Sequence, residues 1–175
     1  MSTTNPASAA LPLAHLTLRI LIIGNWIMAA GIFTLLVIAP HRAWILSSLS
    51  LAPSPEAERV IWGLRTIAVL GLVAVPLNYH GLKRLLAIVE TVRTGDPFVA
   101  MNANRLRAIG WILLTLQVLS VIIGWIGRAI SSPAHPIDIN AGFSINGWLA
   151  VLLTFLLARV FAEGARMRDD LEGTV

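Results

Sequence analysis

The chain contains no cysteine, and only 13% of its 175 residues are charged. The first absence excludes disulfides, thiolate catalysis and cysteine-ligated zinc or iron–sulfur clusters. Charged residues make up about 25% of an ordinary soluble domain, so the second absence excludes that class. The sequence also lacks a phosphate-binding loop, a nucleophile elbow and an HExxH motif. These absences predict a protein that is not an enzyme and carries no cofactor or metal.

Hydrophobic residues, in contrast, make up 57% of the chain, and its mean hydropathy is +0.79. This composition predicts an integral membrane protein with the lipid bilayer as its main partner. The net charge of +4 is modest. In a membrane protein the placement of charges matters more than their sum. A net charge of this size therefore does not indicate binding to nucleic acid, and no direct contact with nucleic acid is expected.

Four apolar runs are each long enough to cross a hydrocarbon core of about 30 Å. They span residues 16–39, 60–77, 108–130 and 145–161. The first run is too long for the apolar core of a signal peptide. We therefore expect an all-α membrane protein with four transmembrane helices in one domain, residues 14–175, after a flexible tail, residues 1–13.

The second and third spans are joined by a segment that keeps a helical pattern. Apolar residues recur at three- and four-residue spacing from Leu82 to Val92, so the second helix continues to Thr94. Ser54, followed by Pro55 and acidic residues, predicts where that helix starts.

The turn of this predicted hairpin falls at Gly95. Glycine suits the residue just past a helix, Asp96 could serve as an N-cap and Pro97 as the first helical residue, with the next helix under way at Phe98. The pattern predicts a helical hairpin over residues 78–107 that extends beyond the membrane. The fourth helix is expected to continue past its span, into residues 162–175.

Basic residues divide unequally between the two ends of the predicted spans. Nine lie at the end that contains the hairpin and four at the other: Arg19, Lys83, Arg84, Arg93, Arg105, Arg107, Arg159, Arg166 and Arg168 against Arg42, Arg59, Arg65 and Arg128. Since cytoplasmic loops are enriched in Lys and Arg, both termini and the hairpin are predicted to be cytoplasmic.

Five polar residues fall within the predicted spans or at their ends: Asn25, Arg65, Gln117, Asn146 and Arg159. Polar groups in lipid are costly, so such positions are candidates for function. Amides commonly hydrogen-bond between helices, and arginines near span ends reach the interface or pair with acids, so we favour packing for all five. The alternative is a small oligomeric transporter or channel with a polar path through Asn25, Gln117 and Asn146.

The four histidines allow a third class, a haem-binding redox subunit. Two ligands at matching depth would be required, and the pairs that the topology allows are His15 with His80 and His41 with His135. Isolated histidines near span ends are more often interfacial than ligands, so no haem is expected.

The hairpin itself has three interpretations. In the first, its basic residues do no more than fix the topology and contact lipid headgroups. Its apolar stripe could also pack on the end of the fourth helix, or its surface could bind a soluble partner. The candidate partner-binding residues are Lys83, Arg84, Arg93, Asp96, Phe98, Asn102, Asn104, Arg105 and Arg107.

Several segments resemble a bacterial membrane family catalogued as domain of unknown function 2975. They are Gly95-Asp96-Pro97-Phe98-Val99 with Asn102 and Arg105-Leu106-Arg107, Ile109-Gly110-Trp111, Phe143-Ser144-Ile145-Asn146-Gly147, and Arg159-Val160-Phe161 with Glu163-Gly164-Ala165 and the tail Asp170-Leu171-Glu172-Gly173-Thr174-Val175. Met101 stands where the family pattern has a glutamate.

This resemblance implies a four-helix protein of the bacterial inner membrane. Such proteins are often encoded beside a small helix-turn-helix regulator of the Cro/repressor type. The resemblance therefore implies a regulatory or accessory role in which the membrane protein sequesters, or signals to, a DNA-binding protein.

Overall fold

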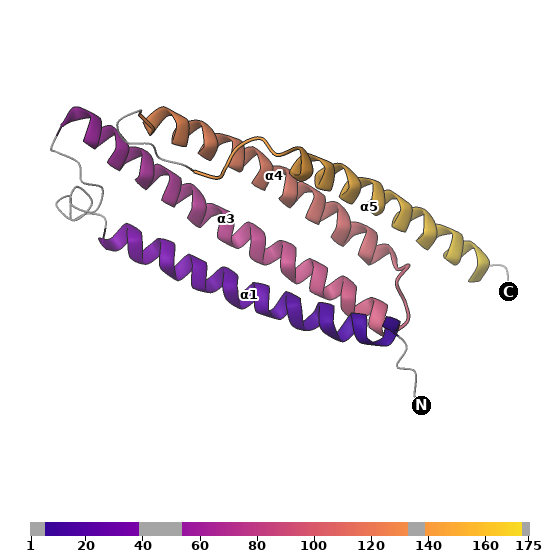
Figure 1. Ribbon diagram of the computed structural model, residues 1–175. Helices are drawn as coiled ribbons and strands as arrows, with labels where there is room; N and C mark the ends of the chain where they lie inside the picture. The colour runs from indigo at the N-terminus through magenta and orange to yellow at the C-terminus, as the bar shows by residue number, and fades with distance from the viewer. Residues whose placement is uncertain (1–5, 39–53, 133–138, 173–175) are drawn as a thin grey trace.

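The computed structural model describes residues 6–38, 54–132 and 139–172, and these residues form four long helices (Figure 1). The helices are α1 (Pro6–Ile38), α3 (Pro55–Arg93), α4 (Ala100–Ile130) and α5 (Ile145–Glu172). Each contains a stretch long and apolar enough to cross a membrane. The predicted all-α fold with four spans is confirmed.

The helices pack in chain order. α1 packs against α3, α3 against α4, and α4 against α5. Among the described residues, no other pair of helices shares an extensive contact. The result is an open array with α1 at one edge and α5 at the other (Figure 1).

The array brings three segments to the same end. Figure 1 shows the start of α1, the turn between α3 and α4, and the end of α5 together at one end of the molecule. The predicted topology also puts these segments on one side of the membrane. Their assignment to the cytoplasm stays a prediction from the charge count.

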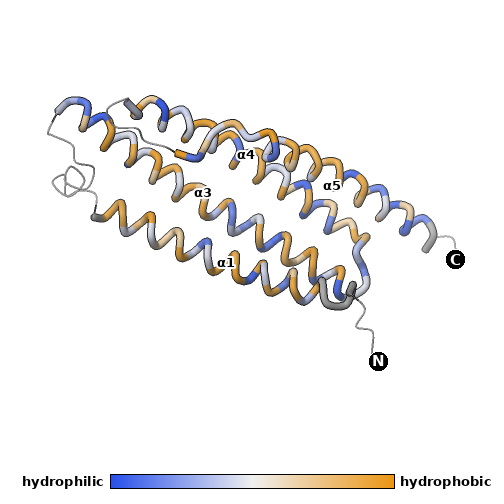
Figure 2. The backbone as a smooth tube through the Cα atoms, in the orientation of Figure 1, coloured by the Kyte–Doolittle hydropathy of each residue, from blue (hydrophilic) through white to orange (hydrophobic). Residues whose placement is uncertain are grey.

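Large apolar side chains cover the outside of the array. Trp26, Phe33, Trp125 and Leu152 are all exposed. Figure 2 shows hydrophobic residues along much of the helices and hydrophilic residues toward the outer turns of α5. An apolar exterior of this extent is unfavourable in water and suits a lipid surrounding.

The start of α1 differs from the sequence prediction. Residues 6–13, expected to belong to a flexible tail, form the first turns of α1, and Pro12 lies inside the helix. The alanine-rich stretch Ala7 to Ala10 favours a helix, and Pro6 suits its first position. The rest of the predicted tail, and the Pro40 stop, lie outside the described residues.

The start and end of α3 match the prediction. Ser54 is the N-cap, and its Oγ accepts a hydrogen bond from the Ala57 N–H at 3.2 Å. The helix continues without a break to Arg93. It is a single helix of 39 residues, and it extends past residue 77, the predicted end of the second span.

The approach to α5 was not predicted. Ile145 begins the helix as expected, but residues 139–144 lie along α4 instead of outside the span (Figure 1). Gln117 Nε2 donates to the Ser144 carbonyl at 3.4 Å, at a point thirteen residues before the end of α4 at Ile130. At 1.5 Å per residue, α5 therefore begins about 20 Å inward from that end.

Small and polar side chains on α4 make room for this segment. A Cβ added at Gly124 would lie 2.5 Å from the Ala141 carbonyl oxygen, so only glycine permits the approach. The Ser120 hydroxyl lies 3.2 Å from both the Gly142 N–H and its carbonyl oxygen. Non-helical backbone at membrane depth requires such partners, because lipid supplies none.

Candidate functional site: the hairpin and the end of α5

Residues 84–109 and 158–172, which we call the hairpin end, contain most of the candidate positions. The turn is built by Gly95, whose φ is +87°. Its N–H donates to the Val92 carbonyl at 3.1 Å, and the Asp96 N–H donates to the Thr91 carbonyl at 3.0 Å. This is a Schellman motif, which ends α3 and satisfies its last carbonyls.

Two details of the predicted turn are wrong. α4 begins at Ala100 instead of Phe98, and its N-cap is Val99, which makes no side-chain capping bond. Asp96 is therefore not an N-cap, and Pro97 is not the first helical residue. The Asp96 N–H is instead used to close α3, by its bond to the Thr91 carbonyl, and its carboxylate faces α5, so neither group is available to start α4.

The carboxylate of Asp96 has a different partner. Arg168 Nη1, near the end of α5, donates to Asp96 Oδ1 in an ion pair between side chains that are partly exposed. The pair joins the turn to α5. Because it is accessible to water, its contribution to stability is small.

Asn102 is the fully buried polar residue of the hairpin, with 0% exposure. Its Nδ2 donates to Thr91 Oγ1 at 2.7 Å and to the Pro97 carbonyl at 2.9 Å. Its Oδ1 accepts from Arg105 Nη1 at 2.9 Å. One amide thus connects α3, the turn and α4, which is the arrangement expected of a structural residue.

Arg105 extends this network. Its Nη1 also donates to the Ala87 carbonyl on α3 at 3.2 Å. Asn102 and Arg105, predicted as partner-binding residues, therefore make contacts within the hairpin.

The hairpin packs on the end of α5. Ile88, Leu106 and Ala158 form a buried cluster, with Val92, Ile109 and Phe161 packed around it. The ring of Phe98 lies 5.3 Å from that of Phe161, centroid to centroid. Of the three interpretations drawn from the sequence, the structure thus supports packing of the apolar stripe on the fourth helix.

The remaining candidate residues lie at the surface. Lys83 Nζ stands 5.2 Å from the ring centre of Tyr79, Arg84 donates to the His80 carbonyl at 3.4 Å, and Arg93 pairs with Glu90 at 3.2 Å. The side chains of Asn104 and Arg107 are exposed. These positions are accessible to a partner.

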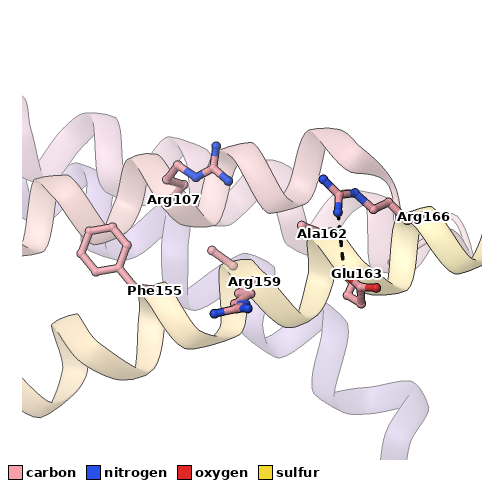
Figure 3. A pocket seen from close by; sticks show the side chains of 7 residues that line it. Arg107, Phe155, Arg159, Ala162, Glu163 and Arg166 are labelled. Atoms are coloured by element: carbon pink, nitrogen blue, oxygen red, sulfur yellow. Dashed lines mark ion pairs between the residues drawn. The ribbon is translucent and has the colours of Figure 1, made fainter.

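A groove runs between α4 and α5 at the hairpin end. Its volume is about 420 Å³, and it is lined by Arg107, Phe155, Ala158, Arg159, Ala162, Glu163 and Arg166 (Figure 3). Arg107 and Arg159 were both candidates from the sequence, but they were not predicted to lie together. The signal was available: Phe155, Arg159, Glu163 and Arg166 recur at three- and four-residue spacing, which places them on one face of a helix.

The polar residues predicted in the spans are not brought together. Asn25 is 7% exposed and donates to the Val75 carbonyl at 3.2 Å, while Gln117 bonds Ser144 as described above. Arg65 lies 5.4 Å from the ring centre of Trp62, and the side chain of Asn146 is exposed. Asn25 and Gln117 thus connect neighbouring segments.

The histidines give no support to a haem pair. Asn25 faces Val75, so His15 and His80 are offset by five residues along the helices, or about 8 Å. His80 Nδ1 lies 2.7 Å from the Pro76 carbonyl oxygen. His41 and His135 lie outside the described residues, within which no group of ligands suited to a metal occurs.

The family assignment follows from the whole length of the chain. The model of the family described as protein of unknown function DUF2975 matches residues 3–175. The chain belongs to this family. No curated protein and no solved structure matches it. The family resemblance seen in the sequence, including the segment from Gly95 to Arg107, is thereby confirmed. The structure adds that this DUF2975 protein has four helices apolar enough to cross a membrane.

Proposed function

We propose that this DUF2975 protein is a non-enzymatic regulatory or accessory protein of the bacterial inner membrane. Its hairpin end binds a small helix-turn-helix transcription regulator and holds it at the membrane. The observation that carries this proposal is apolar exposure beyond the span: Met101 is 59% exposed, Met167 56% and Phe98 45%. In water, such side chains mark a surface that another protein covers.

The position of these residues supports the proposal. The predicted fourth span ends at residue 161, and Met167 lies six residues later, about 9 Å further along α5. Phe98 and Met101 belong to the turn and the first helical turn after it. All three therefore lie where a soluble protein has access.

The construction of the hairpin end supports it as well. The buried amide of Asn102 and the cluster around Leu106 hold α3, α4 and α5 in one arrangement. A surface that is already ordered loses little conformational entropy when a partner binds.

The transporter or channel alternative receives less support. It required a polar path through Asn25, Gln117 and Asn146. The amides of Asn25 and Gln117 are instead used in contacts with Val75 and Ser144.

The test uses the protein in lipid nanodiscs and the purified helix-turn-helix regulator encoded beside its gene. We expect saturable binding to the wild type, and a loss of about tenfold or more in affinity when Met101→Glu and Met167→Glu are combined. Arg59→Glu, an exposed position at the opposite end of α3, is the matched control and should bind as the wild type does.

Membrane insertion and helix content are measured alongside by size-exclusion chromatography and circular dichroism. The proposal fails if the wild type does not bind the regulator. It also fails if the double variant, folded as the wild type, binds equally well.

A further inference from the structure

The groove between α4 and α5 carries an excess of positive charge. Arg107 projects from α4, and Arg159 and Arg166 lie on α5, with Glu163 as the single acid among the lining residues (Figure 3). Glu163 pairs with Arg166 at 3.9 Å, and both side chains are more than half exposed. An exposed pair of this length is weak, so Arg166 remains free to contact an anion.

Arg107 and Arg159 have no such partner. Within the described residues, neither guanidinium makes a hydrogen bond or an ion pair. A guanidinium presents a planar fork of donors that matches a phosphate in two parallel hydrogen bonds. Two unpaired forks on facing helices provide the chemistry of a phosphate site.

The groove also changes from apolar to polar along its length. Phe155 lies within the predicted fourth span, and its ring packs 5.5 Å from that of Trp111. Arg159 follows one turn later, and Arg166 about 10 Å beyond it. A phospholipid has the same gradient, with acyl chains, then a phosphate, then a polar headgroup.

From this arrangement we propose that the groove binds the phosphate of an anionic phospholipid. Arg107 and Arg159 hold the phosphate, the acyl chain passes along Phe155, and Arg166 faces the headgroup. A volume of about 420 Å³ is sufficient for a headgroup. Basic pockets between helices at the cytoplasmic face are sites of this kind.

This site lies within the same hairpin end that is proposed to bind a regulator, but its lining does not include Phe98, Met101 or Met167. The two proposals are therefore tested by different variants.

The test is native mass spectrometry of the purified protein, titrated with phosphatidylglycerol or with phosphatidylcholine. We expect phosphatidylglycerol to bind the wild type about tenfold more tightly than phosphatidylcholine, because Arg166 repels the cationic choline headgroup. Both lipids carry the phosphate, so combining Arg107→Gln and Arg159→Gln should weaken the binding of each lipid by about tenfold, whereas Arg166→Gln should abolish the preference between them. Arg93→Gln, an exposed arginine at the same end but outside the groove, is the matched control and should change neither the affinity nor the preference.

A second variant keeps the charge but removes the planar fork. Arg107→Lys with Arg159→Lys should weaken phosphatidylglycerol binding severalfold without abolishing it. Circular dichroism and gel filtration establish that each variant is folded. An unchanged affinity for phosphatidylglycerol in the folded double glutamine variant overturns the proposal.

A final arm separates the lipid from a soluble phosphate compound. Inorganic phosphate and glycerol phosphate are added to the protein alone and in competition with phosphatidylglycerol. We expect neither to displace the lipid. If either binds as tightly as phosphatidylglycerol, the acyl chain contributes nothing and the assignment to a lipid is wrong.

Discussion

The Asn102 amide donates to the Thr91 hydroxyl across the hairpin at 2.7 Å, and Asn102 itself is fully buried. The same nitrogen reaches the carbonyl of Pro97 at 2.9 Å. Asn102, which the sequence placed on a partner-binding surface, is thus a structural residue that holds the hairpin together.

Replacing Asn102 with alanine should destabilise the hairpin. The change removes the hydrogen bonds to Thr91 Oγ1, the Pro97 carbonyl and Arg105 Nη1 at a fully buried position, which costs about 1–3 kcal/mol. Thermal unfolding in a mild detergent measures the loss. Asn104→Ala is the matched control, since Asn104 is exposed two residues away, and it should change stability by less than about 0.5 kcal/mol. Equal melting temperatures for the two variants would contradict the network.

Gly95→Ala should also destabilise the hairpin, by about 1 kcal/mol, because φ is +87° at this position and a Cβ strains the backbone there. The same detergent unfolding assay applies. Gly24 lies inside α1 with open space around it, so Gly24→Ala should be neutral or slightly stabilising. A stability gain at both positions would show that Gly95 is not required for the turn.

The position of residues 139–144 can be tested by cross-linking, since the chain has no cysteine of its own. A Cβ at Gly127 would lie 3.2 Å from that of Ile139, close to disulfide distance. Gly127→Cys with Ile139→Cys should therefore form a disulfide under mild oxidation, counted as the loss of two maleimide-reactive thiols. Gly110→Cys with Ile139→Cys is the control, because Gly110 faces Phe155. Two free thiols in the first pair would place the segment elsewhere.

The ion pair of Asp96 with Arg168 should contribute little. A double-mutant cycle with Asp96→Asn and Arg168→Gln is expected to give a coupling energy of about 0.2–1 kcal/mol, because both side chains are partly exposed. The coupling should decrease as salt is added, since salt screens exposed charges. A coupling of several kcal/mol, independent of salt, would indicate a buried pair and contradict the geometry.

Much of the fold could be predicted because local chemistry determines it. Ser54 and Pro55 define the start of α3, and the spacing of Leu82 to Val92 carries that helix past its span. Other features depend on tertiary contacts, which rules for local sequence do not include. The role of Asp96 depends on Arg168, which is distant in sequence, and the local rule for an N-cap gave the wrong answer.

The same distinction applies to the candidate site. The arginines were evident, but their distribution between the Asn102 network and the groove depends on how α5 packs against α4. The path of residues 139–144 was missed for a similar reason. Ser120, Gly124 and Gly127 recur at four- and three-residue spacing, and such a stripe of small residues permits the close approach of another segment without naming it.

That path has a consequence for how the protein is made. Until Ser120 and Gln117 are beside it, the non-helical segment before α5 has backbone groups that lipid cannot satisfy. The segment before α5, and α5 with it, therefore cannot move from the insertion machinery into the bilayer without α4. We expect α4 to wait for α5 during biogenesis, so that the two partition into the bilayer as one hairpin.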